Sequence, residues 1–364
     1  MTDLFGLAGI DASEFQFARN VDKSLLYDAV TDFVAHAVEE TRMAQALFVQ
    51  GTTEKITEKY KLPMRGRMSK IKAGASPTPR TVVGAWDVGY DLENHEDMFQ
   101  MTDVDFNYMT PDAFNNHIVG IVTIYQDTLR YEILRHLFNN TTLTFADDRF
   151  GDISVRPLAN GDSAVYPPAV GGSTERTALQ QYLASGYASS AISDVNDPIK
   201  TLKALFVANF GVVQGGSNVI ALINPNQEDK ISALTDFIAT PKRDVSRASD
   251  TEYTVGGLQR LNSLSAEVIG SLHGVDVATW SFIPEDYILA VDGMNPAPLK
   301  QRVDLSGTGL GSGALQLMES GNHAGQMYNR WRARMGFGVA NRLNGAVMHL
   351  TAGSYTVPSD YSWA

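Results

Sequence analysis

The chain has 364 residues and a net charge of −12, with 41 acidic against 29 basic side chains. A chain of this length forms one large or two medium domains with a sizeable core, and its excess of acids argues against a protein whose main task is to grip nucleic acid phosphates. The absence of cysteine excludes disulfides, thiolate metal sites and cysteine nucleophiles, and no apolar run approaches the roughly 20 residues of a membrane span.

The first 50 residues are acidic, with eight acids and three basic residues. Residues 1–20 carry aromatic side chains without a strong period, and we expect them to form an extended arm. From about Asp22 to Val49 apolar residues recur at helical spacing, which predicts an amphipathic helix.

A strongly basic segment follows from Lys55 to Arg80, with eight basic residues and one acid, Glu58. Its first part alternates apolar and charged residues, which predicts a strand, and a return strand is expected around Trp86. Seven acids without a Lys or Arg between them then occupy residues 87–105. Because such a ribbon is marginal alone in water, we expect its apolar face to lie on a neighbouring copy of the chain. Folding back onto its own domain and binding of nucleic acid are the alternatives.

The longest predicted helix runs from Pro111 to Phe138. Thr110 is placed to cap it and Pro111 suits its first position, while Arg135 and His136 in the last turn suit the helix dipole. A helix that is apolar on more than one side is buried on more than one side. This predicts a spine that packs on its own subunit and on something else, with a core helix of one large domain as the alternative. Besides the main stripe, a second apolar set consists of Val119, Ile124, Leu134 and Phe138.

The remaining chain alternates short apolar strands with helices, which predicts a mixed α/β domain. The expected elements are strands at 143–145, 153–155, 218–223, 275–282, 287–291 and 346–350, and helices at 198–210 and 225–237. Residues 327–339 alternate again and place Arg330, Arg332 and Arg334 on one face. A row of guanidinium groups pairs with carboxylates or phosphates, or is simply solvated.

Motifs for chemistry are scarce. The chain contains no phosphate-binding G-x-x-x-x-G-K-[ST] loop, no H-E-x-x-H and no G-x-S-x-G. Its seven histidines are scattered without ligand spacing, and its paired acids are typical of a solvated surface. The sequence therefore predicts no catalytic residues, no metal site and no cofactor.

The order of these parts resembles the HK97-fold major capsid proteins of tailed bacteriophages. The resemblance extends over essentially the whole chain, and it rests on the order of local sequences at 106–111, 218–225, 274–280 and 334–339. It implies an α+β fold with an N-terminal arm and helix (1–50), an E-loop β-ribbon (51–105), a peripheral domain with the spine helix (106–145 and 325–364) and a mixed α/β axial domain (146–324).

The resemblance also implies a function and partners. The chain is expected to assemble into hexamers and pentamers of an icosahedral shell around viral DNA, in a virion capsid assembled in the host cytoplasm. Scaffolding, portal and decoration proteins are the expected partners, with weak non-specific contact to packaged DNA and no membrane. Fifty residues before the E-loop are too few for a fused scaffolding segment, so scaffolding is expected to be a separate protein or already removed.

An encapsulin-type nanocompartment shell and an unrecognised α/β enzyme are the alternative functions. For the shell subunit, we expect Lys59, Lys61, Arg65 and Arg67 to meet acids of a neighbouring subunit. The full set of expected inter-subunit contacts is Lys59, Lys61, Arg65, Arg67, Trp86, Glu93, Glu96, Asp97, Arg330, Arg332 and Arg334.

Overall fold

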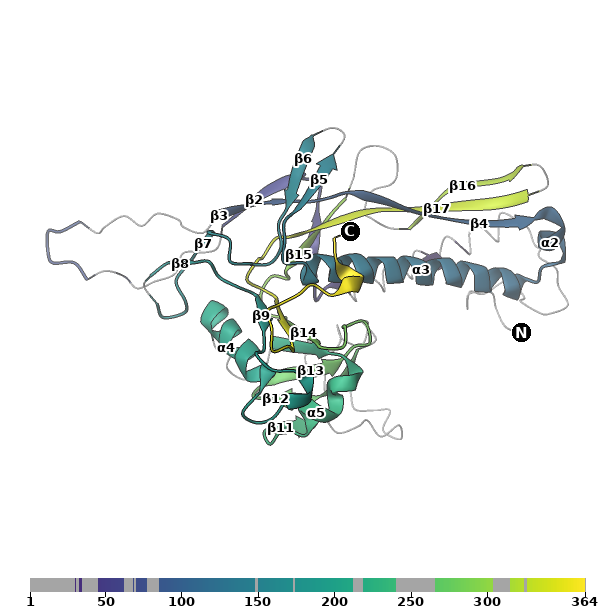
Figure 1. Ribbon diagram of the computed structural model, residues 1–364. Coiled ribbons are helices and arrows are strands. Elements are labelled where there is room, and N and C mark those ends of the chain that lie inside the picture. Colours follow the sequence, from purple (N-terminus) through teal and green to yellow (C-terminus); the bar gives the residue numbers. More distant parts are fainter. Residues whose placement is uncertain are drawn as a thin grey trace.

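The described residues belong to an elongated layer built along one long helix and to a second, rounder lobe beneath it (Figure 1). The predicted arm and nearly all of the predicted helix at 22–49 lie outside them. The computed structural model describes residues 30, 33–34, 45–61, 68, 70–76, 85–147, 150–172, 174–211, 219–239, 266–303, 315–323 and 326–363.

The helices of this part of the chain differ greatly in length. The long helix, α3, has 28 residues, which corresponds to about 42 Å at roughly 1.5 Å per residue. None of the described helices is long and apolar enough to cross a membrane. They are α2 (Asp103–Tyr108), α3 (Pro111–Phe138), α4 (Pro198–Phe210) and α5 (Glu228–Ser232), with 3₁₀ turns at Ser189–Ala191, Pro225–Gln227 and Ser359–Tyr361.

The sequence predicts α3 with its correct bounds. The Thr110 side chain accepts a hydrogen bond from the backbone N–H of Ala113 at 3.2 Å, as a helix N-cap does. The apolar stripe is buried, and from the second apolar set Leu134 and Phe138 are buried too. Val119 and Ile124 instead remain 40% and 52% exposed, so these two apolar side chains of α3 are left uncovered.

A five-stranded sheet runs along α3 (Figure 1). Its strand order is β1-β15-β17-β16, and β4 also pairs with β17, antiparallel and over ten residue pairs. The buried side chains of β17, such as Trp331 and Met335, belong to the same core as the α3 stripe. The strands are β1 (Val49–Thr53), β4 (Glu93–Thr102), β15 (Leu299–Arg302), β16 (Gln316–His323) and β17 (Gln326–Val339).

The second lobe is a seven-stranded sheet with the order β11-β12-β13-β10-β14-β18-β9. Alternate residues of β10 face opposite cores: Leu222 faces the α3 core and Ile223 faces the core formed with α4 and α5. Burial on both faces explains why these strands are continuous apolar runs. The strands are β9 (Tyr182–Ala184), β10 (Val219–Ile223), β11 (Phe237–Ala239), β12 (Glu267–Leu272), β13 (Val275–Thr279), β14 (Tyr287–Asp292) and β18 (Ala346–His349).

Three two-stranded ribbons complete the fold. The predicted basic ribbon is formed by β2 and β3, and residues 70–76, which lie between them in the sequence, are far from both layers (Figure 1). The other two ribbons are the hairpin β5–β6 and the short pair β7–β8. Their bounds are β2 (Thr57–Lys61), β3 (Ala85–Gly89), β5 (Leu143–Asp147), β6 (Gly151–Val155), β7 (Val165–Tyr166) and β8 (Arg176–Thr177).

Three sequence predictions need correction. The acidic segment that was assigned to the ribbon forms β4, which lies in the α3-side sheet beside β17. The helix expected at 225–237 ends at Ser232, because residues 237–239 pair with β12 as strand β11. The last forty residues are shared between the two layers, since β17 lies on α3 while β18 joins the seven-stranded sheet.

The chain leaves the ribbon through a very narrow crossing. Residues 89–91 pass between β6 on one side and β17 on the other. A methyl group on Gly89 would lie 2.5 Å from the backbone oxygen of Ser154, and one on Gly338 would lie 2.6 Å from the backbone oxygen of Gly89. A methyl group on Gly336 would overlap the backbone oxygen of Asp91. Glycine is therefore required here for close backbone approach.

Replacing Gly336 with alanine should destabilise the subunit, because the clash is with backbone that has no free space to move. We expect Gly336→Ala to lower the free energy of unfolding by roughly 3 kcal/mol, the upper end of ordinary overpacking costs. The matched control is Gly120→Ala on α3, where an added methyl group meets nothing within 4 Å. That change should raise stability by about 0.5–1 kcal/mol. Denaturant unfolding of the purified chains measures the free energy of unfolding of both variants. Equal changes in the two variants would show that residues 89–91 do not pass this close to β17.

Candidate assembly interface

The root of the ribbon is fixed by a polar cluster around Glu58. Its carboxylate accepts hydrogen bonds from the Tyr60 hydroxyl at 2.5 Å and from the Thr53 hydroxyl at 3.1 Å, and it forms an ion pair with Lys300 at 2.9 Å. The Tyr90 hydroxyl lies 2.8 Å from that of Tyr60. Burial alone would raise the pKa of Glu58, but these hydrogen bonds and Lys300 outweigh it and lower the pKa to about 2. The cluster ties β2 and Tyr90, the residue that follows β3, to Lys300 on β15.

The apolar face of the ribbon root packs on its own subunit. Trp86 is 4% exposed and its ring lies 5.5 Å from that of Tyr166, in a cluster that also contains Val88 and Leu343. Trp86 therefore presents little surface to a neighbouring copy, and its expected inter-subunit contact is corrected to an internal one. The root of the ribbon therefore packs on its own domain, which was the alternative to packing on a neighbouring copy.

Beside the crossing, a buried ion pair joins the spine helix to the chain that leaves the ribbon. His136 Nε2 lies 3.1 Å from Asp91 Oδ2, and both side chains are at most 2% exposed. The other Asp91 oxygen accepts the backbone N–H of Phe337 at 2.8 Å. Burial alone would lower the pKa of His136, but the Asp91 carboxylate raises it above its ordinary value. One carboxylate thus connects α3, β17 and the ribbon exit.

The arginine row on β17 meets a carboxylate within the same chain. Arg330 Nε donates to Glu96 at 2.8 Å, and Arg332 Nε donates to the other oxygen of Glu96 at 2.5 Å. Glu96 stands directly opposite Arg332 in the β4–β17 pairing. Hydrogen bonds from Arg330 and Arg332 lower the pKa of Glu96. Of the alternatives that the sequence leaves open for this row, Arg330 and Arg332 follow the pairing with a carboxylate, and that carboxylate belongs to the same chain.

The other residues expected at contacts between subunits are spread over the long layer. Lys59 is exposed on β2 opposite Asp87, and Asp97 lies on β4 with one oxygen accepting the backbone N–H of Met98. Arg334 lies on the face of β17 that carries Arg330 and Arg332. The Lys61 side chain, Arg65 and Arg67 lie outside the described residues. Among the described residues, Lys59 forms no ion pair with Glu93, Glu96 or Asp97 of the same chain.

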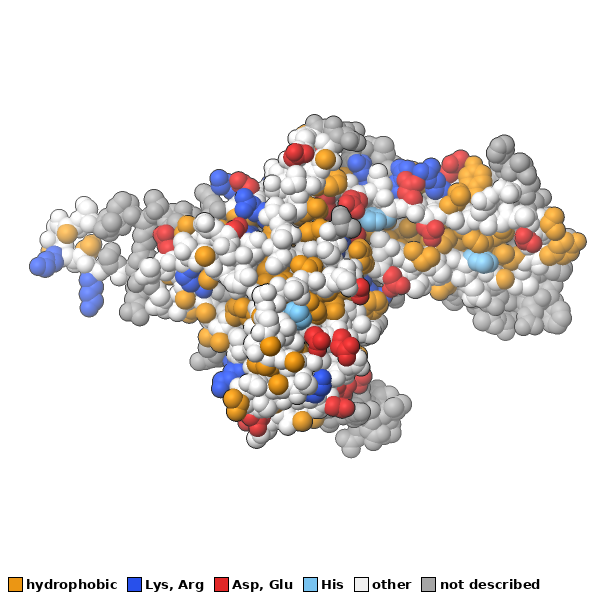
Figure 2. Space-filling view, in the orientation of Figure 1, with side chains coloured by type: hydrophobic (Ala, Val, Ile, Leu, Met, Phe, Trp, Pro, Cys, Tyr) orange, Lys and Arg blue, Asp and Glu red, His pale blue; other side chains and the backbone are white. Residues whose placement is uncertain are grey.

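Exposed apolar side chains occur at two places on this layer. Toward the far end of the ribbon, Met68 and Ile71 are 98% and 54% exposed. On α3, Val119, Ile124 and Tyr131 are all at least 40% exposed, and hydrophobic side chains gather along this helix in Figure 2. Uncovered apolar groups clustered on one element mark surfaces for contact with another protein.

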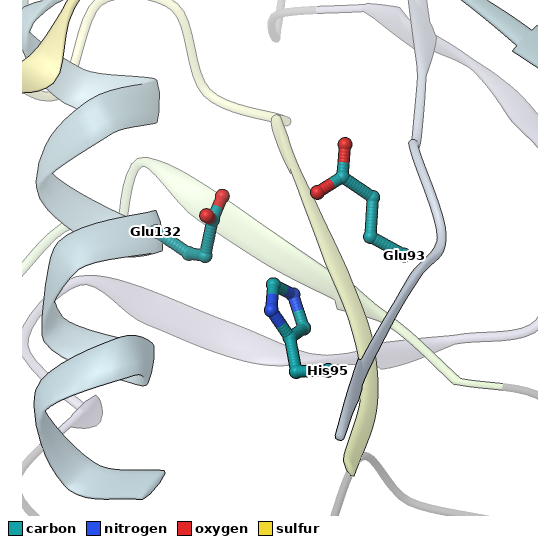
Figure 3. Close-up of side chains that lie close together, drawn as sticks. All are labelled: Glu93, His95 and Glu132. Carbon is teal, nitrogen blue, oxygen red and sulfur yellow. The ribbon is translucent and has the colours of Figure 1, made fainter. Parts of the chain in front are cut away.

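One group of side chains has the composition of a metal site. Glu93 and His95 from β4 and Glu132 from α3 bring ligand atoms within 4.8 Å of one another (Figure 3). This group was not predicted from the sequence. The only signal for it in the sequence is that Glu93 and His95 are two residues apart, which places both on one face of a strand.

The Glu58 cluster and the Asp91–His136 pair were not predicted from the sequence either. Glu58 carried a signal, since it is the single acid among eight bases between Lys55 and Arg80. Asp91 and Lys300 carried none, because their partners are distant in the sequence and become adjacent only through the chain crossing.

No protein-family model matches this chain, and no curated protein matches its sequence. Among solved structures it is similar to one from Mycobacterium phage Patience, with 18% identity, a TM-score of 0.65, and 96% of this chain and 93% of that chain covered. It is also similar to the capsid structure of the Cyanophage P-SCSP1u, with 10% identity, a TM-score of 0.50, and 83% and 86% of the two chains covered.

The fold is that of a phage capsid protein. A third similar structure, the capsid asymmetric unit of Cyanophage Pam1, has 11% identity and a TM-score of 0.50, with 84% of this chain and 88% of that chain covered. These likenesses confirm the predicted α+β, HK97-like class, and identities this low show the fold alone.

Neutralising Glu58 should reduce stability in a manner that depends on pH. Its folded pKa of about 2 lies below the ordinary value of 4.5, so the ionised carboxylate stabilises the fold above pH 4.5, and this contribution is lost as pH falls toward 2. We expect Glu58→Gln to lower the unfolding midpoint at pH 7, with the deficit shrinking between pH 4.5 and 2. Urea unfolding against pH measures this, with exposed Glu54→Gln as the control. A deficit that grows in acid would contradict the assignment.

Removing the Glu96 charge should leave two neighbouring guanidinium groups without their shared carboxylate. We expect Glu96→Gln to lower the unfolding midpoint at low ionic strength, and the loss to narrow at about 1 M salt because such charges are then screened beyond roughly 3 Å. Asp97→Asn on the same strand is the control and should show a smaller dependence on salt. An unchanged midpoint for Glu96→Gln at low salt would show that the network contributes nothing.

Proposed function

We propose that this chain is a structural subunit that assembles into the icosahedral shell of a virus capsid and encloses viral DNA. The observation that carries the proposal is the agreement in fold over nearly the whole chain with the Patience phage structure, at a TM-score of 0.65. The two cyanophage capsid structures support the same role. Because these similar structures come from phages, we favour a virion capsid over a nanocompartment shell.

The ribbon supports assembly through contacts between copies. Its root is held by Glu58 and Trp86 on its own subunit, while residues 70–76 beyond it are all exposed. Figure 2 shows Lys and Arg side chains at this far end. A rigid root with an uncovered tip that carries both apolar and cationic groups suits insertion onto a neighbouring copy, where Met68 and Ile71 would be covered.

The charges suit a contact between copies. The basic residues Lys59, Lys61, Arg65 and Arg67 are proposed to meet acids on the adjacent subunit. Glu96 is already paired with Arg330 and Arg332, and Glu93 lies beside Glu132 of its own chain, so Asp97 is the remaining candidate from the acidic segment. Exposed pairs each contribute only about 0–1 kcal/mol, but a repeated set can fix the register of assembly.

The proposed assembly state is hexamers and pentamers of a closed shell in the virion, made in the host cytoplasm. Scaffolding, portal and decoration proteins are proposed partners. Packaged DNA is proposed to meet only weak non-specific contacts, which fits a net charge of −12 and an arginine row that already shares a carboxylate.

Shortening the ribbon tests this function. Lys61 and Ala85 face each other as the last pair of the ribbon, so replacing residues 62–84 by Asn-Gly closes it with a two-residue hairpin turn. The shortened chain should fold, because its root contacts are intact, and it should fail to assemble. Sedimentation velocity of both chains, alone and with a scaffold, measures the outcome.

Thermal unfolding of the shortened chain is the control, and its midpoint should match that of the full chain. Assembly of the shortened chain into particles would refute the role of the ribbon. A full chain that sediments only as a monomer with every scaffold would refute the shell function.

A further inference from the structure

The residues Glu93, His95 and Glu132 converge from two elements onto one point (Figure 3). Glu93 and His95 lie on the face of β4 that is turned toward the interior, and Glu132 lies on α3 with its side chain 7% exposed. In a tetrahedral zinc site with bonds of about 2.1 Å, neighbouring ligand atoms are roughly 3.4 Å apart. The ligand atoms of this group lie within 4.8 Å of one another, and binding of zinc would bring them closer by rotation of these side chains.

The surroundings of Glu132 disfavour the ionised form of its carboxyl group. Burial and the nearby Glu93 carboxylate raise the pKa of Glu132, and together they outweigh His136, Arg135 and His95, which lower it. The Arg135 guanidinium lies 3.4 Å from Glu132, a long contact, and it stacks 4.7 Å above the ring of Trp363. Within the described residues, the side chains of Glu93 and His95 make no hydrogen bond or ion pair.

We propose that Glu93, His95 and Glu132 bind a divalent transition-metal cation, with zinc as the best match, and that water completes its coordination. Two carboxylates and one imidazole are zinc ligands, and a neutral imidazole favours zinc over magnesium or calcium, which prefer oxygen alone. The cation joins β4 to α3. Because Glu132 and His136 are one turn apart on α3, this link stands beside the Asp91–His136 pair at the exit of the ribbon. The proposal does not depend on the shell function.

Zinc titration of the metal-stripped full chain tests the site. We expect a single zinc ion to bind per chain by calorimetry and to raise the thermal unfolding midpoint, since a ligand that binds only the folded state stabilises it. His95→Ala and Glu132→Gln should each weaken zinc binding by at least about tenfold, as loss of even a supporting residue does at metal sites. Magnesium at the same concentration should produce no comparable shift.

Two variants control for nonspecific binding by neighbouring groups. Asp97→Asn removes a carboxylate from the same face of the same strand, and His117→Ala removes an exposed imidazole from α3. Both should bind zinc as the unaltered chain does, and the absence of cysteine excludes thiolate binding. Failure of the unaltered chain to bind zinc, or binding that His95→Ala leaves unchanged, would overturn the proposal. Circular dichroism of His95→Ala, whose side chain is only partly buried, establishes that the variant is folded.

Discussion

The whole arrangement depends on the crossing at residues 89–91. There the chain that leaves the ribbon passes between β6 and β17 with backbone almost touching backbone, and Gly89, Gly336 and Gly338 make that approach possible. Asp91 then bonds to His136 on α3 and to the backbone of β17. A single short segment thus fixes the direction of the ribbon, the position of β4 and the seating of the spine helix.

The charges of the long layer are used in two different ways. Near the root of the ribbon and along β17, cations and carboxylates from distant parts of the sequence pair within one subunit, as Glu58 does with Lys300 and Glu96 does with Arg330 and Arg332. Toward the tip, Lys70 and Lys72 are exposed beside exposed apolar groups. Internal pairs orient the ribbon, and the exposed end is left for contact with another molecule. In the proposed shell, this division would keep the subunit rigid before assembly and restrict its contacts with other copies to defined places.

The sequence predicted the elements whose signals are local. The spine helix has a cap, a proline and a long apolar stripe, and its bounds agree with the structure. Strand β4 was missed because both of its faces carry polar residues, for example Glu93 and Glu96, so no hydrophobic alternation marks it. Glu96 and Arg330 were expected at contacts between subunits for a related reason. Their opposite charges are evident from the sequence, but only the β4–β17 register shows that the two residues pair within one chain. Trp86 was likewise placed on a neighbour, because nothing local indicates the pocket formed by Tyr166 and Leu343.

Electron cryomicroscopy of the expressed chain, produced with and without a scaffold, tests the central claim most directly. The account predicts closed particles tens of nanometres across, in which α3 and the five-stranded sheet form the wall and each ribbon tip lies on an adjacent copy. Monodisperse single subunits under all conditions, or a closed shell in which the ribbon tip contacts only its own subunit, would contradict it.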